Sequence, residues 1–181
     1  MLISLLPRIH LKYLALLLGV WAMTCAARAQ DVTAVAHVDL NRYLGRWYEI
    51  ASFPMFFQRH CLRNTQAEYS LNKHGDILVY NHCETANGLE TAHGHAHVVP
   101  GSHSARLRVS FFWPFYGNYW IIGLDDQYQW AVVGEPGRDY LWVLARKPQL
   151  SPSELHKALI TAQAQGYDLS KLRYTPQISA Y

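Results

Sequence analysis

Three histidines at every second position have the clearest metal-binding spacing in this 181-residue chain. His93, His95 and His97 would project from one face of a strand, because side chains alternate between its two faces. Imidazole is a good ligand for zinc, copper and nickel, and His82 and His103 could join the set. However, side chains along one strand seldom converge on one ion without ligands from another element. We therefore interpret the three histidines as a polar outer face with no metal ligand assigned, and keep a metal-binding exported protein as an alternative.

Glu49, Tyr69 and Tyr119 are the candidates for acid–base chemistry, provided that they face a bound molecule. No pair of them has the mutual arrangement that acid–base catalysis demands. The chain also has no Gly-rich phosphate loop and no Ser-His-Asp spacing. We therefore predict a binding protein without a cofactor, and keep an enzyme on the same fold as a second alternative.

Cys61 and Cys83 are the two cysteines that follow the N-terminal segment. An even number of cysteines in an exported protein favours a disulfide, and no base is visibly paired with either thiol. Closing this loop would stabilise the fold by roughly 3 kcal/mol on a chain-entropy estimate. We predict a Cys61–Cys83 bridge.

Residues 1–29 have the pattern of a secretory signal peptide. A basic start precedes an apolar run over 13–23, which is too short to span a membrane, and Ala27-Arg28-Ala29 supplies the cleavage pattern. We predict removal of 1–29, a single domain over 30–181 and a soluble periplasmic protein. The alternative is a lipid anchor at Cys25 in the outer membrane, although Met23 and Thr24 fit poorly before such a cysteine.

The composition indicates one globular domain. Hydrophobic residues make up 50%, aromatic residues 13% and charged residues only 16%, which is far from the composition of a disordered chain. The net charge is +3, and no Lys/Arg cluster stands out beyond the N-terminus. Nucleic-acid binding is therefore not expected.

The elements that must position these residues are strands at regular intervals, separated by turn signals. Aromatic and β-branched residues over 45–53, ending at Pro54, indicate the first strand. The others are predicted at 65–71, 77–84, 90–99, 104–113, 118–124, 129–134 and 140–146. Short hairpin connections imply antiparallel neighbours, and closing eight strands into an up-and-down barrel removes both exposed sheet edges. We predict an all-β, eight-stranded antiparallel barrel.

One helix should follow the strands and pack outside the barrel. Ser151-Pro152-Ser153-Glu154 is a capping box with proline at the first helical position, and Gly166 is the expected stop. A short helical turn at 39–44 and an extended tail over 167–181 complete the prediction.

The alternation of side chains predicts what lines the barrel. Gly45, Trp47, Glu49, Ala51 and Phe53 would share one face of the first strand. Several other inward positions are small, which would leave room for an amphipathic molecule; ordinary core packing is the alternative, because periodicity does not measure volume. The apolar loop after Pro54 is either folded over the core or a flap at the pocket mouth. The predicted ligand contacts are Phe53, Met55, Phe56, Ala67, Tyr69, Val79, Leu107, Val109, Phe111, Tyr119, Ile121, Val133, Tyr140 and Trp142.

Three ordered motifs resemble the signature regions of the lipocalins. They are Gly45-x-Trp47-Tyr48-Glu49, the turn Leu124-Asp125-x-x-Tyr128, and the segment 140–146 ending in Leu144-Ala145-Arg146. The similarity runs over about residues 43–174, and within the family the sequence looks most like the bacterial lipocalins and the apolipoprotein D group.

This resemblance implies that Trp47 closes one end of the barrel, with Arg146 across its indole face, and that the ligand lies toward the open end. It also implies a fatty acid, lysophospholipid or similar hydrophobic ligand, and lipid transport or storage at the cell envelope. The enzyme alternative would then act on this bound lipid. Possible membrane association and a monomer or homodimer complete the expectations.

Overall fold

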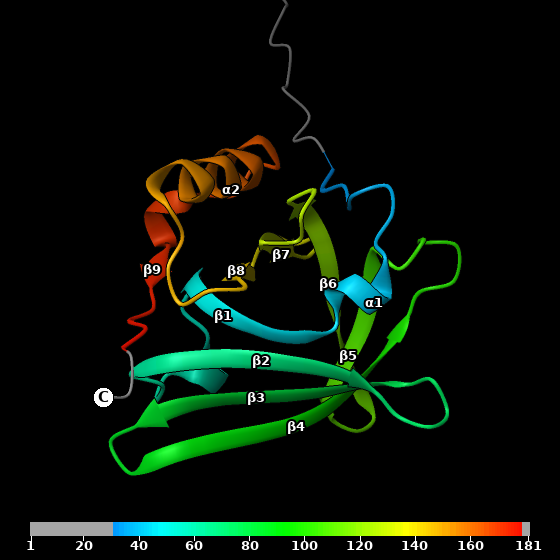
Figure 1. Cartoon of the computed structure of the whole chain (residues 1–181), viewed down its shortest axis with the longest axis horizontal. Coiled ribbons are helices and arrows are strands. Elements are labelled where there is room, and N and C mark those ends of the chain that lie inside the picture. The colour runs from blue at the N-terminus through cyan, green and yellow to red at the C-terminus, as the bar shows by residue number, and fades with distance from the viewer. Residues whose placement is uncertain (1–30, 179–181) are drawn as a thin grey trace, which may run out of the picture.

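The fold is a closed antiparallel barrel with a helix on its outside (Figure 1). The computed structural model describes residues 31–178; the expected signal peptide and Cys25 lie outside them. Within this range, eight strands follow one another around the barrel in chain order, and β1 pairs with both β8 and β2 to close it. These strands are β1 (Gly45–Ser52), β2 (Arg63–Leu71), β3 (Ile77–Thr85), β4 (Gly88–Val98), β5 (Arg106–Phe112), β6 (Phe115–Leu124), β7 (Trp130–Gly134) and β8 (Leu141–Ala145). The predicted up-and-down barrel is confirmed.

Tight turns between the strands explain why neighbours in the sequence are neighbours in the sheet. In the β2–β3 turn, Asn72 Oδ1 accepts hydrogen bonds from the amides of His74 and Asp76. Gly75 follows with a φ of +85°, a conformation that costs glycine little. Because such hairpins reverse the chain within a few residues, long crossovers are not needed.

The alternation predicted for β1 is wrong beyond Glu49. A β-bulge shifts the pairing with β8 between Glu49 and Ala51, so that Glu49 and Ser52 both face the barrel interior. Ala51 and Phe53 instead belong to the hydrophobic cluster outside the sheet. One extra residue in a strand moves every later side chain to the opposite face, and the local pattern does not mark its position.

The helix α2 (Pro152–Ala164) packs against the outer faces of β6 and β7, as predicted. Ser151 and Glu154 form the expected capping box. Ala158 and Ala162 are buried against the sheet, and a Cβ on Gly123 of β6 would lie 2.6 Å from Thr161 of the helix. The absence of that Cβ allows the close approach. No helix within residues 31–178 is long and apolar enough to cross a bilayer.

Short elements complete the barrel at its seams. The helix α1 (Leu40–Tyr43), capped by Asp39, is the predicted helical turn, and the 3₁₀ turns η1 (Phe56–Gln58) and η2 (Leu169–Lys171) lie in loops. The expected extended tail contains β9 (Arg173–Tyr174), which pairs with β1. Gln177 then donates hydrogen bonds to the carbonyls of Glu49 in β1 and Thr65 in β2. The tail therefore bridges β1 and β2 where these strands have ceased to pair directly.

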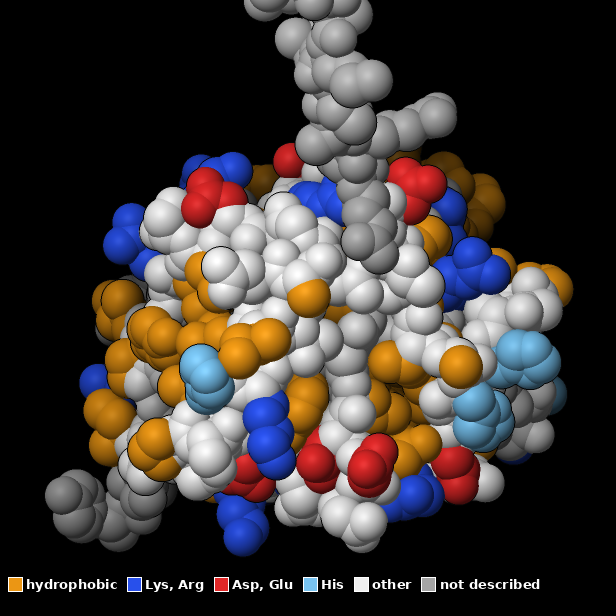
Figure 2. Space-filling view, turned by 90° about the horizontal axis from the view of Figure 1, so that it is seen from above, with side chains coloured by type: hydrophobic (Ala, Val, Ile, Leu, Met, Phe, Trp, Pro, Cys, Tyr) orange, Lys and Arg blue, Asp and Glu red, His pale blue; other side chains and the backbone are white. Residues whose placement is uncertain are grey.

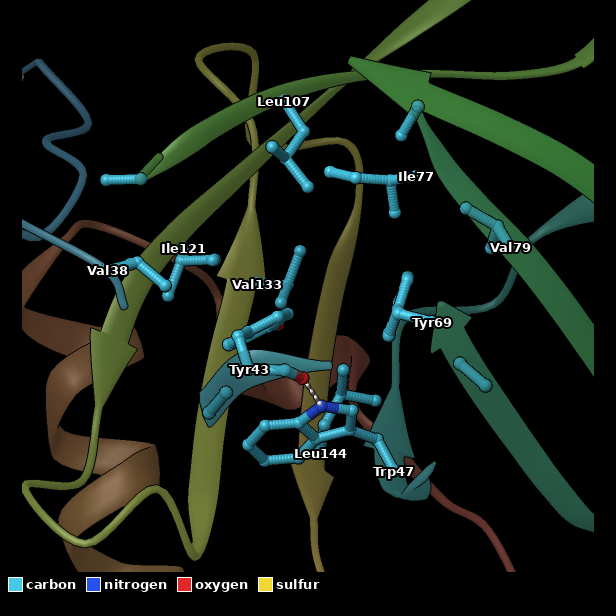
Figure 3. Packing of buried hydrophobic residues seen from close by; sticks show 14 residues of the cluster. Val38, Tyr43, Trp47, Tyr69, Ile77, Val79, Leu107, Ile121, Val133 and Leu144 are labelled. Atoms are coloured by element: carbon cyan, nitrogen blue, oxygen red, sulfur yellow. Dashed lines mark hydrogen bonds between the residues drawn. The ribbon is translucent and has the colours of Figure 1, made fainter. Parts of the chain in front are cut away.

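Two hydrophobic clusters lie on opposite sides of the sheet wall. The outer cluster joins the sheet to α2. The inner cluster fills the end of the barrel that contains Trp47, which we call the lower part. Figure 3 shows the inner cluster, with Trp47, Tyr43 and Tyr69 on the same side as Ile121, Val133 and Leu144. The disulfide between Cys61 and Cys83 is present, which confirms the predicted bridge and ties the β1–β2 loop to β3.

Candidate functional site

Trp47 seals one end of the barrel. Its indole is fully buried, and its Nε1 donates a 2.8 Å hydrogen bond to the carbonyl of Tyr43 (Figure 3). The guanidinium of Arg146 lies 3.8 Å from the indole centroid, a cation–π geometry. Arg146 also donates hydrogen bonds to the carbonyls of Arg42, Tyr43 and Arg46, so it ties α1 and β1 to the end of β8.

Three tyrosines form the floor above this seal. The hydroxyl of Tyr119 lies 2.8 Å from that of Tyr43 and 2.9 Å from that of Tyr69. Burial raises the pKa of Tyr69 to about 12 and raises the pKa values of Tyr43 and Tyr119 well above the ordinary value. The three phenols therefore stay neutral at physiological pH and act only as hydrogen-bonding groups.

The inner wall contains most of the predicted contacts. Six of them are buried in the inner cluster, namely Ala67, Tyr69, Val79, Leu107, Ile121 and Val133. Val109, Tyr119 and Trp142 pack against that cluster and are partly buried. This cluster makes a packed base at the Trp47 end of the barrel, in which Ile121 and Val133 have no exposed surface.

The end of the barrel interior opposite Trp47 has small residues and residues that solvent reaches. Gly94 pairs with Val79 of the inner wall, so its missing side chain would point inward, and a Cβ there would lie 2.8 Å from the Phe111 ring. Phe111 therefore lies along the inner wall and is still 45% exposed. Ala92, on the same face of β4 as Gly94, is also exposed. Small residues and solvent-accessible aromatic surface together describe a mouth at this end.

The loop after β1 lies at the mouth and borders a cavity. Met55 is buried, Phe56 is exposed, and both line a cavity of about 440 Å³ between this loop and the C-terminal tail. Gln58 reaches from the loop to donate to Glu49, and its Oε1 accepts from Trp142 Nε1 at 3.4 Å. The loop is thus connected to the interior through one amide side chain.

Phe53 and Tyr140 were predicted to lie on the inner wall, but neither belongs to the inner cluster. Phe53 packs in the outer cluster, with its ring centroid 6.0 Å from that of Tyr167, because the β1 bulge turns it outward; it also lines the loop cavity. Tyr140 precedes β8 at the rim, where it stacks on Trp142 and approaches Phe57.

Polar groups in the interior were largely missed by the sequence reasoning. Glu49 is only 5% exposed, and its carboxylate accepts hydrogen bonds from Ser52, Gln58 and Thr175. Asn81 pairs with Ala67 and Ala92, so it faces inward, and its buried Oδ1 has no hydrogen-bond partner among residues 31–178. The alternation of Ile77, Val79 and Asn81 could have indicated this position. The partners of Glu49 could not have been found from periodicity, because Ser52 faces inward only through the bulge and Thr175 comes from the distant C-terminal tail.

The alternative chemistries have no assembled site in the described part of the chain. No group of three His, Cys, Asp or Glu side chains there is placed to hold a metal ion. His93 packs against Tyr80, and His95 and His97 pack against Tyr116 on the outer face. Among the acid–base candidates, Tyr69 and Tyr119 bond within the tyrosine floor, whereas Glu49 bonds to Ser52, Gln58 and Thr175.

An eight-stranded barrel sealed by a Gly-x-Trp strand can be compared with known families. A family model described as a lipocalin-like domain matches residues 38–177. This chain belongs to the lipocalin family. The lipocalin is 41% identical over 150 residues to the outer membrane lipoprotein Blc of Escherichia coli K12, covering 82% of this chain and 84% of that protein. It is 38% identical over 156 residues to temperature-induced lipocalin-1 of Arabidopsis thaliana, with the same coverages of 82% and 84%.

More distant relatives agree with this assignment. Bovine apolipoprotein D is 30% identical over 151 residues, covering 78% of each chain. Insecticyanin from the tobacco hornworm Manduca sexta superposes with a TM-score of 0.68 at 20% identity, covering 84% of this lipocalin and 87% of that chain. At such identity the structural likeness supports the fold alone.

Proposed function

We propose that this lipocalin is an exported carrier that holds a fatty acid, lysophospholipid or similar hydrophobic molecule in its barrel. The observation that carries the proposal is the contrast between the two halves of the interior. The lower half is closed by Trp47 and the tyrosine floor, whereas the upper half has small inward residues and an exposed Phe111 ring. A mostly apolar, one-ended recess suits a molecule with one long apolar part.

The polar groups near the mouth suit an amphipathic ligand. Asn81 Oδ1 lacks a partner among the described residues, so a donor on the ligand would satisfy it. Gln58 lies beside Trp142, and its amide would meet the polar end of the ligand while the acyl chain extends toward the floor. The ligand contacts we propose are the inner-wall residues and Trp142, with Met55 and Phe56 in the loop above.

Export and envelope location are part of the same proposal. The disulfide supports an oxidising compartment, and the Blc relatives are named outer membrane lipoproteins. We propose cleavage after residue 29, a periplasmic protein over 30–181 and a role in lipid transport or storage at the envelope. The competing form is anchored through Cys25, and radiolabelled palmitate incorporation with a Cys25→Ala control distinguishes the two.

The decisive experiment is mass spectrometry of lipids that co-purify with protein made in its own host. A stoichiometric acyl lipid supports the carrier, and its chain length and headgroup identify the ligand class. Recovery of protein free of lipid, combined with failure to take up a fluorescent fatty acid, would reject the proposal. Release of a chemically altered lipid on prolonged incubation would instead favour the enzyme alternative.

A further inference from the structure

Large apolar side chains are exposed at one end of the barrel. Phe112, Trp113 and Phe115, at the β5–β6 hairpin, are 76%, 76% and 71% exposed. Phe56 in the β1–β2 loop and Leu89 near the β3–β4 turn are also largely exposed. In an up-and-down barrel alternate connections lie at the same end, so these three connections surround the mouth. Scattered exposed hydrophobic residues are ordinary, whereas a group of aromatic residues on one hairpin marks an interaction surface.

A basic face adjoins this aromatic hairpin. Arg106 and Arg108 lie on the outer side of β5 and line a groove of about 410 Å³ together with His97, Tyr116 and Trp120. Arg106 lies 5.3 Å from the Trp120 centroid, and Arg108 donates to the Tyr116 carbonyl at 3.1 Å. Neither guanidinium is within 4.0 Å of a carboxylate belonging to the described residues. Both retain donors that a phosphate group could accept from.

Acidic residues are absent from the outer face of β4, β5 and β6 beside the groove. Its side chains are basic, polar or aromatic: His93, His95, His97, Arg106, Arg108, Ser110, Tyr116, Asn118 and Trp120. At the rim, Glu84 pairs with Arg63, and Glu90 lies 3.9 Å from His60. The face seen in Figure 2 has acidic and basic side chains mixed around its edge. Arg106 and Arg108, which have no carboxylate partner among the described residues, therefore lie on the strand that leads into the aromatic hairpin.

We propose that this lipocalin docks, mouth first, on a membrane that contains anionic phospholipids. Phe112, Trp113 and Phe115 enter the boundary between headgroups and acyl chains, and the arginine groove binds lipid phosphates. The end of the groove nearest the hairpin is at a matching depth, whereas Arg106, two residues further from Phe112, lies about 5 Å farther from the membrane. Arg108 is four residues before Phe112, about 13 Å along a strand, and a barrel strand tilt of about 40° reduces this to roughly 10 Å of depth. Interfacial apolar side chains penetrate about 5–10 Å, which leaves Arg108 level with the phosphates.

Docking in this way would place the open half of the barrel against the bilayer. A lipid could then pass between membrane and barrel without its acyl chain crossing bulk water. Exposing an acyl chain to water is unfavourable, because apolar surface is more stable away from water. This consequence rests on the proposed carrier function, whereas the docking itself does not. The two are therefore tested separately.

The test is co-sedimentation of the purified exported protein with vesicles, either pure phosphatidylcholine or an equimolar mixture with phosphatidylglycerol. Wild type should bind the mixed vesicles more tightly, and high salt should weaken binding because it screens the arginines. Arg108→Gln should lose about fivefold in affinity for mixed vesicles, and adding Arg106→Gln should lose less than a further fivefold, because Arg106 lies farther from the phosphates. Phe112→Ser, Trp113→Ser and Phe115→Ser combined should reduce binding to both vesicle types.

Matched controls test position as well as residue type. Ile160→Ser removes an exposed apolar side chain of α2, and Lys73→Gln removes a positive charge in the β2–β3 turn at the closed end. Both should bind like wild type. All variants should keep the wild-type circular dichroism spectrum and take up a fluorescent fatty acid from solution, because none of these residues is among the proposed ligand contacts.

Three outcomes would overturn the docking proposal. They are no binding of wild type to mixed vesicles, equal affinity for both vesicle types, or equal losses in the control variants. Sedimentation velocity tests whether the aromatic hairpin instead binds a second copy of this chain. If the aromatic substitutions convert a dimer to a monomer while wild type ignores vesicles, the surface joins two copies of this chain. Failure of fatty-acid uptake with intact vesicle binding would instead reject the carrier function alone.

Discussion

Replacing Trp47 by alanine should destabilise the barrel strongly. The indole is fully buried between Tyr43, whose ring centroid is 5.0 Å away, and the Arg146 guanidinium at 3.8 Å. Truncating a core aromatic of this size costs about 3–5 kcal/mol. The lost indole hydrogen bond should add little, because the Tyr43 carbonyl also accepts from Arg146 Nη2 at 3.1 Å. For a domain of this length the loss corresponds to a fall in Tm of roughly 6–20 °C.

The contribution of Arg146 can be separated from that of Trp47 by a double-mutant cycle. Trp47→Ala, Arg146→Gln and the double variant would be unfolded in urea and followed by far-UV circular dichroism. We expect a coupling free energy of about 0.5–2 kcal/mol, the range for a cation–π contact. Arg146→Lys should recover only part of it, because lysine lacks the planar fork that reaches the carbonyls of Arg42 and Arg46.

The reasoning about the barrel seal would be refuted by a Trp47→Ala loss below about 1 kcal/mol, the size of an ordinary substitution. Zero coupling with Arg146 would refute the stacking contribution alone. The folded fraction of each variant should still take up a fluorescent fatty acid, because Trp47 lies below the tyrosine floor. Loss of uptake by folded Trp47→Ala protein would move the ligand to the closed end.

Three further predictions concern the disulfide, the pocket and the tyrosine floor. Reduction of Cys61–Cys83 should lower the free energy of unfolding by about 3 kcal/mol, and equal melting with and without reductant would contradict this. Trp142→Arg should abolish uptake of a fluorescent fatty acid while the fold survives, whereas Ile160→Arg on α2 should leave uptake unchanged; uptake by Trp142→Arg at the wild-type level would place the pocket elsewhere. Because the pKa of Tyr69 is raised from 10.0 to about 12, its contribution to stability is complete below pH 10 and is lost as the pH rises toward 12. Urea unfolding should show a shallower decline over this range in Tyr69→Phe; an identical decline would mean that other groups cause it.

The order of the strands, the helix and the family were available from the sequence. Turn residues such as Asn72 and Gly75 act within a few positions, and the capping box of Ser151 and Glu154 is entirely local. Alternation along β5 also placed Leu107 and Val109 on the inner face correctly. These features follow from interactions between residues close in the chain, which a linear pattern records.

The tertiary structure alone decided which groups meet in the interior. The bulge after Glu49 turned Phe53 outward, and the C-terminal tail brought Thr175 to the Glu49 carboxylate. The tyrosine floor joins α1, β2 and β6 through Tyr43, Tyr69 and Tyr119. Such contacts depend on barrel closure and on a one-residue shift in register, and neither has a signature in the periodicity of any single segment. The sequence by itself therefore determined the kind of barrel, and its closure determined which side chains line the interior.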